Sequence, residues 1–251
     1  MRYLVLGPAA MGIFSHIGVL KKHESELSQV EEISGSSAGA IIALFLAMGY
    51  DMDKILDVCL DINISDYTKI HLKSFLSNYG FIDIKPIREK LIQICDGNPT
   101  FRELDKKIYI SAYCVNTSST VYFSRDTHPD MHVIDAVCMS MAIPFIFSTA
   151  KYQDHTYVDG GTEEMAPMEP FIDKKPHEIT CVKVVSEVPY VEKIENPQMF
   201  AHTLLLSYLK NRRENIQKGV HVINIDVSNY DIFDFNMTQE EKIKLFFEGY
   251  N

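Results

Sequence analysis

The chain has little of what marks exported or membrane-spanning proteins. Its five cysteines are never spaced as C-x-x-C, and no basic stretch followed by an apolar core opens the sequence. The longest apolar run, from Ala38 to Met48, is interrupted by Gly39 and is too short to cross a bilayer. We therefore expect a cytoplasmic protein in a reducing compartment, with its scattered cysteines as small core side chains.

Positive charge is also scarce. The 24 lysines and arginines stand against 34 aspartates and glutamates, which gives a formal net charge of −10. Nucleic-acid binding needs clustered basic side chains that displace counterions, so nucleic acid is excluded as a partner. Four basic residues fall along one predicted helix and are interpreted as its solvated face, with local contact to lipid headgroups as the alternative; they are Lys210, Arg212, Arg213 and Lys218.

Short apolar segments alternate with helical stretches along the chain, which is typical of a mostly parallel sheet covered by helices. A long helix is predicted from Asn196 to Gln217, because Asn196 and Pro197 supply a cap residue and a first-turn proline. Without repeats or low-complexity linkers, residues 1–251 are predicted to form one α/β domain. Strands are predicted at Tyr3–Leu6, Val30–Ser34, Lys107–Val115, Thr120–Phe123, His155–Val158, Glu178–Val185 and Val220–Ile225.

Gly35-Ser36-Ser37-Ala38-Gly39 has the pattern G-x-S-x-G and lies between a predicted strand and an apolar helix. In that setting the central serine occupies a strained turn that lifts its hydroxyl above the sheet, and small neighbours let strand and helix pass closely. The helix N-terminus adds positive potential for a developing negative charge. Ser37 is therefore the candidate nucleophile, and the alternative is a tight structural turn.

A second glycine motif, Gly7-Pro8-Ala9-Ala10-Met11-Gly12, follows the first predicted strand. Such a loop can aim backbone N–H groups at the oxygen of a tetrahedral intermediate, although a plain strand-to-helix turn fits the same pattern. Only one confident strand precedes the strand that leads to Ser37. An α/β-hydrolase places its nucleophile after several strands, so Ser37 comes too early for that class.

The third motif, Asp159-Gly160-Gly161, follows the predicted strand His155–Val158. Two glycines allow the backbone to turn without Cβ clashes directly after the carboxylate. A β-turn aspartate is the commoner meaning of such a motif, but with the other two motifs Asp159 can act as general base to Ser37. Three histidines follow Asp159 without a recognisable loop motif, and none is expected to be catalytic: His177, His202 and His221.

The ordered set of glycine loop, G-x-S-x-G and late D-G-G resembles the patatin-like phospholipases. His16-Ile17-Gly18-Val19-Leu20 is similar to the family's helix after the loop, and residues 140–147, SMAIPFIF, are similar to its S-x-A-x-P-x-x-F block. The resemblance extends over about residues 3 to 170. It implies a three-layer α/β/α fold, a Ser37–Asp159 dyad without histidine, metal or cofactor, and hydrolysis of phospholipid or lysophospholipid acyl esters through an acyl-serine at a lipid interface.

The glycine loop departs from the family pattern. Pro8 and Ala9 replace two glycines, and Met11 stands where an arginine or lysine is usual. Pro8 has no N–H, so the expected oxyanion donors are the amides of Ala9 and Ala10, with Ala38 as a third. The missing basic residue leaves the charge balance of the site open. Alternative functions are a transacylase or neutral-lipid hydrolase with the same dyad, or a non-catalytic lipid-binding pseudoenzyme.

The stretch from Ile62 to Ile84 is rich in aromatic and aliphatic residues without clear periodicity. It is interpreted either as an apolar cap over the site or as a packing connection between two helices.

Overall fold

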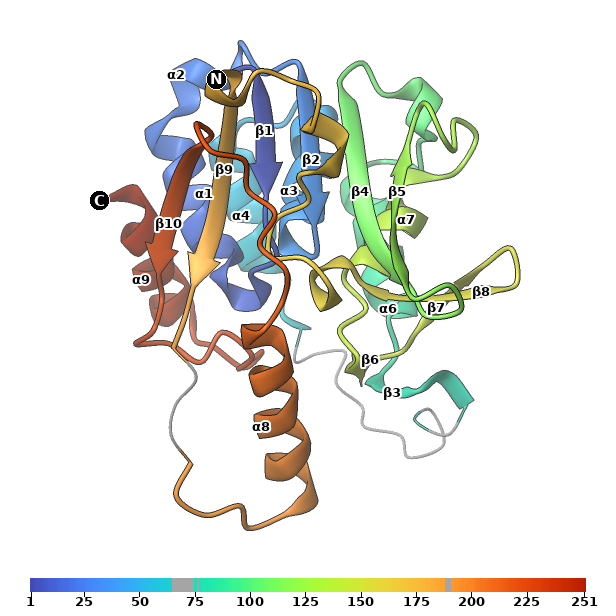
Figure 1. Ribbon diagram of the computed structural model, residues 1–251, viewed down its shortest axis with the longest axis vertical. Coiled ribbons are helices and arrows are strands. Elements are labelled where there is room, and N and C mark those ends of the chain that lie inside the picture. Colours follow the sequence, from blue (N-terminus) through green and yellow to red (C-terminus); the bar gives the residue numbers. More distant parts are fainter. Residues whose placement is uncertain (65–74, 76, 188–190) are drawn as a thin grey trace.

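The computed structural model describes residues 1–64, 75, 77–187 and 191–251. Eight strands form the main sheet in the order β10-β9-β1-β2-β4-β8-β7, with β5 paired to β4 (Figure 1). A separate two-stranded sheet joins β3 (Gly80–Ile82) to β6 (Phe145–Phe147). The main-sheet strands are β1 (Tyr3–Leu6), β2 (Glu32–Ser36), β4 (Lys107–Cys114), β5 (Ser119–Ser124), β7 (Ala150–Tyr152), β8 (His155–Asp159), β9 (Ile179–Val185) and β10 (His221–Asp226).

The five strands from β10 to β4 run parallel, and the antiparallel pairs involve β5, β7 and β8 at one side of the sheet. Helices α1, α3, α4 and α9 cover one face (Figure 1). The mostly parallel, three-layer α/β/α prediction is therefore confirmed. The helices are α1 (Ile13–Lys22), α2 (Glu24–Leu27), α3 (Ala38–Ala47), α4 (Met52–Asp61), α6 (Lys85–Ile94), α7 (Val133–Ser140), α8 (Pro197–Lys210) and α9 (Gln239–Tyr250).

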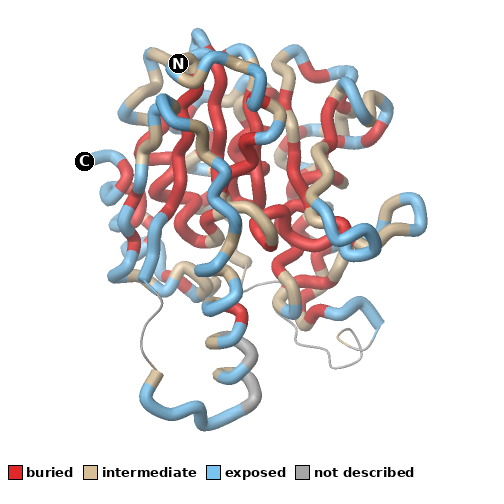
Figure 2. The backbone as a smooth tube through the Cα atoms, viewed as in Figure 1, coloured by how far each residue is buried: buried red, intermediate tan, exposed pale blue. Residues whose placement is uncertain are grey.

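Strand β1 shows why the sheet is covered on both faces. Leu4 and Leu6 pack into the large core beneath the helices, whereas Tyr3 and Val5 pack into a second cluster on the opposite face. That second layer includes Ala166, Met168 and the short 3₁₀-helix Glu169–Phe171, whose Phe171 is fully buried. Because the side chains on both faces of β1 are buried, its sequence is a continuous apolar run and does not alternate between apolar and polar residues. Figure 2 shows the central strands buried along their length.

Two local expectations about the chain need correction. The strand predicted at Val30–Ser34 lies two residues later, at Glu32–Ser36. The helix predicted to reach Gln217 ends at Lys210, because the backbone of Arg213 exchanges hydrogen bonds with Glu163 and Met165 and leaves the helical path. That pairing joins segments distant in sequence, so helix-forming patterns do not reveal it.

Two further expectations concern the cysteines and the apolar stretch after α4. All five cysteines are free and buried, as predicted. Most of the apolar stretch from Ile62 to Ile84, namely residues 65–74 and 76, lies outside the described residues. Its described part includes β3 and two isoleucines, Ile62 and Ile64, that line a pocket beside Ser37.

Candidate active site

Strand β4 brings Ser37 and Asp159 together. It pairs with β5 along one edge, and its other edge is shared by β2, which pairs at residues 107–111, and β8, which pairs at residues 112–114. The last residue of β2, Ser36, lies opposite Ser111, and the last residue of β8, Asp159, lies opposite Ala112. Two strands that approach from opposite directions therefore end at adjacent positions, and the next residue after β2 is Ser37.

Ser37 occupies the strained turn that the motif predicts. Its φ of 54° and ψ of −121° place it in a backbone region that side chains rarely adopt, directly before helix α3. The flanking glycines allow this turn, since a Cβ on Gly39 would collide with the carbonyl of Leu6, and one on Gly35 would lie 2.5 Å from the carbonyl oxygen of Gly39. Any larger residue at either position would push α3 away from the sheet.

The segment that follows α7 ties both candidate residues to the same backbone. The buried hydroxyl of Ser140 accepts a 2.8 Å hydrogen bond from the Ser37 amide, and the Ala142 carbonyl accepts one of 2.9 Å from the Asp159 amide. The S-x-A portion of the sequence block thus has a geometric meaning. Its serine holds the turn at Ser37 and its alanine holds the end of β8.

The carboxyl of Asp159 is almost completely buried, with 4% of the residue exposed. Burial raises its pKa to about 6, while the Ser37 hydroxyl, the Gly161 amide and the charge of Arg212 act in the opposite direction. Its Oδ1 accepts the Gly161 N–H at 2.7 Å, and Oδ2 has no hydrogen-bond partner among the described residues. The Ser37 hydroxyl is thus near enough to influence the carboxylate without a formed hydrogen bond, an arrangement common in substrate-free hydrolases.

The glycine loop leaves few backbone donors free. The Gly7 amide donates to Val182, the Met11 amide to Ile232 and the Gly12 amide to Ala9, and Pro8 has no N–H. The remaining loop amides, those of Ala9 and Ala10, have no acceptor among the described residues, and neither has the first amide of α3, that of Ala38. These are the three donors expected from the sequence. Ala10 reaches its place through a positive φ of 47°.

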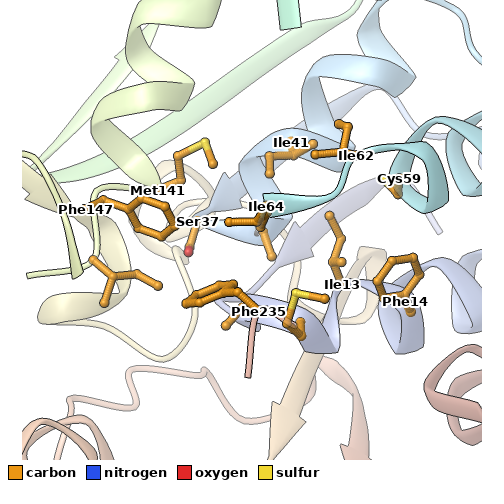
Figure 3. Close-up of a pocket in the computed structure, with 14 residues that line it drawn as sticks. Ile13, Phe14, Ser37, Ile41, Cys59, Ile62, Ile64, Met141, Phe147 and Phe235 are labelled. Atoms are coloured by element: carbon orange, nitrogen blue, oxygen red, sulfur yellow. The ribbon is translucent and has the colours of Figure 1, made fainter. Parts of the chain in front are cut away.

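Ser37 lies where two pockets meet. Figure 3 shows its hydroxyl among apolar side chains of the larger pocket, which is lined by Met11, Ile13, Phe14, Ile41, Cys59, Ile62, Ile64, Met141, Ile143, Phe147 and Phe235 besides Ala10 and Ala38. The second pocket is lined by Ser37, Asp159, Ala9 and Ala10 together with Arg212. The nucleophile candidate therefore has an apolar side suited to a hydrocarbon chain and a polar side that holds the carboxylate.

The comparison with family models agrees with this geometry. A model described as patatin-like phospholipase matches residues 4–172, which is more than half of the chain. The chain belongs to the patatin-like phospholipase family. The match contains all three motifs and the block at residues 140–147, and it confirms the resemblance inferred from them.

Individual relatives of this patatin-like chain are distant. An uncharacterized protein of Acanthamoeba polyphaga mimivirus is 28% identical over 171 residues, which cover 64% of this chain and 58% of that protein. A probable lipid hydrolase of Invertebrate iridescent virus 6 is 25% identical over 178 residues, covering 66% and 61%. A cGAMP-activated phospholipase of Escherichia coli is 26% identical over 141 residues, covering 51% and 39%. The chain thus spans about three fifths of the first two relatives.

Solved structures share the patatin-like fold. VipD from Legionella pneumophila has a TM-score of 0.67 at 16% identity, over 99% of this chain and 65% of that chain. ExoU, in its heterodimeric complex with SpcU from Pseudomonas aeruginosa, has a TM-score of 0.54 at 17% identity, over 100% and 50%. At these identities the likeness concerns the fold alone. None of the described helices is long and apolar enough to cross a membrane.

Against the usual patatin-like loop, Met11 is the departure that the structure explains best. Its side chain is 5% exposed and forms part of the apolar pocket wall, so an arginine there would bury its charge in a hydrocarbon environment. A cation reaches the site from elsewhere. Arg212, which lies two residues after α8, lines the pocket that contains Ser37 and Asp159.

The prediction of a solvated basic face is therefore wrong for Arg212. Its position beyond the end of α8 turns the side chain inward, whereas Arg213 stays 70% exposed and forms a 3.1 Å ion pair with Glu163. No sequence signal separates the two neighbouring arginines. The difference arises from the backbone pairing of Arg213 with the segment after Asp159.

The histidines considered as alternative bases lie elsewhere. His177 borders a hollow with Met1 and Arg2, and His221 is the first residue of β10. Both therefore lie at the end of the sheet where the parallel strands begin. Ser37 lies at the opposite end of the sheet, where the parallel strand β2 ends. The His202 side chain is outside the described residues. No described histidine lines either pocket that contains Ser37.

Proposed function

We propose that the chain hydrolyses acyl esters of lipids through an acyl-Ser37 intermediate, with Asp159 as its catalytic partner and residues 1–251 acting as one hydrolase domain. The observation that carries this proposal is the placement of a strained, pocket-lining Ser37 beside a buried carboxylate with an unpartnered oxygen. Membership of the patatin-like phospholipase family supports it, as do relatives named lipid hydrolase and phospholipase.

The chemistry follows from the geometry of the second pocket, which is lined by Ser37, Asp159 and Arg212 and is called the polar pocket below. Asp159 takes the proton of the Ser37 hydroxyl while Oγ attacks the ester carbonyl carbon. The carbonyl oxygen becomes negatively charged and accepts hydrogen bonds from the free amides of Ala9, Ala10 and Ala38. Collapse of this intermediate expels the alcohol, which receives the proton from Asp159. Water then attacks the acyl-serine with Asp159 again as base, and the fatty acid leaves with Ser37 restored.

The larger pocket beside Ser37, called the apolar pocket below, favours an ester whose acyl part is a long hydrocarbon chain. Apart from Ser37, its lining consists of aliphatic, sulfur-containing and aromatic side chains, most of them from the glycine loop, α1, α3, the end of α4 with the residues after it, and the segment 141–147. Cys59 in this lining is buried, which raises its thiol pKa to about 12 and makes it an inert wall residue. A phospholipase A or lysophospholipase fits this arrangement, because each releases a long acyl chain from a polar alcohol.

Helix α8 supports action at a lipid interface. Phe200, Leu204 and Tyr208 are each more than half exposed and, at a spacing of four residues, share one face of the helix. The helix contains no aspartate or glutamate although the chain has 34 of them, and its Leu209 lines the polar pocket. An exposed apolar stripe without acidic residues next to the site suits contact with lipid headgroups and acyl chains.

The decisive experiment combines active-site labelling with lipid-product analysis. A fluorophosphonate probe is expected to attach to Ser37 alone, and mass spectrometry of the labelled protein locates the adduct. Wild type incubated with mixed lipids is expected to release free fatty acid, and Ser37→Ala to lose at least about 10³-fold in kcat while it remains folded. An adduct on another serine contradicts the assignment of Ser37. Acyl transfer to an added alcohol in place of fatty-acid release would indicate a transacylase.

A further inference from the structure

Arg212 is unusual among the basic side chains near the site because it has no carboxylate partner. The ion pairs among the described residues include Arg213 with Glu163 and Lys183 with Glu214, but none that involves Arg212. Its guanidinium instead donates to two carbonyl oxygens, from Nη1 to Gly161 at 2.8 Å and from Nε to Leu209 at 2.6 Å. The Arg212 side chain is only partly exposed, and a guanidinium with limited access to water is stabilised by a nearby anion.

The contact with Gly161 leads to such an anion. The Gly161 carbonyl accepts from Arg212, and the Gly161 amide donates to Oδ1 of Asp159 at 2.7 Å. One peptide residue thus links the cation to the carboxylate. Gly161 has to be glycine for this link, since a Cβ there would lie 2.6 Å from Pro8 and 2.9 Å from Arg212 Nη1.

No other charged side chain of the described residues faces Asp159 in this pocket. The lining contributed by the glycine loop, the α3 N-terminus, residues 143–144 and residues 232–233 is apolar or uncharged apart from Asp159 and Arg212. Burial lowers the pKa of Arg212, and the nearby Asp159 charge acts to raise it; the reciprocal effect lowers the pKa of Asp159. Asp159 is buried, and Coulomb interactions that involve a buried charge are screened less than those between two exposed charges.

We propose that Arg212 is a positioning residue for Asp159, which holds the Asp159-Gly160-Gly161 turn through the Gly161 carbonyl and keeps the carboxylate in its charged form. This role rests on the proposed hydrolase function. It assigns to the C-terminal part of the chain the cation that the glycine loop lacks at Met11. Only charged Asp159 can take the proton of Ser37, so Arg212 extends the working range of the dyad to lower pH.

The test measures kcat/KM against pH with a soluble p-nitrophenyl ester for wild type, Arg212→Lys, Arg212→Gln and the neighbouring control Arg213→Gln. Wild type is expected to lose activity below about pH 6. Loss of the positive charge raises the pKa of Asp159, so the acid limb of Arg212→Gln should move to higher pH by about one unit or more. Arg212→Lys retains the charge and should keep the limb within about 0.3 unit of wild type, as should Arg213→Gln.

Other results overturn the proposal. An Arg212→Gln protein with normal thermal unfolding and an unshifted acid limb shows that the arginine does not act on Asp159. The same variants are assayed with phospholipid vesicles, where an unshifted limb with a raised KM for phospholipid alone assigns the residue to headgroup binding instead. If Arg212→Gln fails to fold, Arg212→Lys decides the matter: an acid limb shifted by about one unit although the positive charge is retained would contradict a role of charge. A wild type without esterase activity or Ser37 labelling refutes the hydrolase function itself, independently of Arg212.

Discussion

The two sides of the polar pocket are built from different parts of the fold. Ser37 and Asp159 stand at the ends of strands that pair with β4, and each is 4% exposed. The opposite wall is formed by Leu209, Arg212 and Phe233, which come from the connections after β9 and are partly exposed. The first side is fixed by the sheet, whereas the second is held by a few side-chain and backbone contacts.

This difference separates the tasks that each side can perform. Groups that make and break bonds need positions fixed within a fraction of an ångström, and strand ends within a buried sheet provide them. Connections at the surface tolerate movement and sequence change, so they suit electrostatic adjustment and access to lipid. Substitutions on the sheet side are therefore expected to abolish turnover, and those on the C-terminal side to change its pH dependence or its dependence on an interface.

The largest effect is expected for Asp159→Asn. The amide cannot accept the Ser37 proton, so kcat should fall by about 10³-fold or more. The same substitution should not lower the stability of the folded protein. Burial raises the pKa of Asp159 to about 6 in the folded state, so its ionisation opposes folding above that pH by about 3 kcal/mol. Denaturant unfolding at pH 8 should show Asp159→Asn to be at least as stable as wild type.

The histidines provide the control for this prediction. His177→Ala and His221→Ala should each keep activity within about 10-fold of wild type, since both residues lie at the opposite edge of the sheet. A folded histidine variant without activity would restore a Ser-Asp-His triad. A fully active Asp159→Asn protein would remove Asp159 from the mechanism.

The sheet side is also the part that the sequence predicts well. Each of its motifs depends on local requirements, such as the small residues around Ser37 and the glycines after Asp159, which the sequence displays directly. The strand boundaries around them are displaced by no more than two residues. The pairing of β2 and β8 along one edge of β4 is a long-range arrangement, and no local pattern contains it.

The C-terminal side escaped prediction because long-range contacts determine it. Arg212 and Arg213 are adjacent basic residues in a segment whose sequence predicts a continuous helix. The backbone hydrogen bond from Arg213 to Glu163 ends that helix, and the Arg212 side chain then contacts Gly161 beside Asp159. Phe233 and Phe235 line the two pockets from an irregular segment that carries no motif. Their roles follow from where the chain returns to the site after β10, which composition and periodicity do not encode.

The second largest effect is expected within the glycine loop. Ala9→Pro removes one of the free amides proposed to bind the oxyanion, and loss of one such donor costs about 3 kcal/mol, or roughly 10²-fold in kcat. Pro8→Gly removes no donor and should change kcat by about 3-fold or less. Both variants are compared with wild type by steady-state kinetics and thermal unfolding. A folded, active Ala9→Pro protein would place the oxyanion site elsewhere.

A smaller effect is expected for Ser140→Ala, which deprives the Ser37 amide of its acceptor. Ser148→Ala is a matched control, because the buried Ser148 hydroxyl accepts a 3.1 Å hydrogen bond from the Ile84 amide in the same way. Each variant leaves a buried N–H without a partner and should lose about 1–3 kcal/mol of stability. Only Ser140→Ala should also lower kcat, by about 10-fold, because only its partner, Ser37, is the proposed nucleophile. Equal kcat losses would indicate a general effect of destabilisation.

The smallest effect on the chemistry itself is expected on helix α8. Leu204→Ser shortens the exposed apolar stripe without touching either pocket, so hydrolysis of a soluble ester should stay unchanged. Transfer of a leucine side chain into an apolar environment contributes about 1.5–3 kcal/mol, so binding to phosphatidylcholine vesicles and hydrolysis of vesicle lipid should weaken by about 10-fold. Vesicle flotation of the Ser37→Ala protein, with and without Leu204→Ser, measures binding apart from turnover.

Ile172→Ser is the matched control for this helix. Ile172 is 61% exposed, close to the 59% of Leu204, but lies beyond the 3₁₀-helix Glu169–Phe171 on the far layer of the sheet. Its replacement should leave vesicle binding at the wild-type level, because exposure alone does not make a docking surface. Equal losses in both variants would mean that apolar contact with lipid is unspecific. If Leu204→Ser instead dissociates a dimer in sedimentation and leaves vesicle binding intact, the α8 stripe is a contact between two copies of the chain.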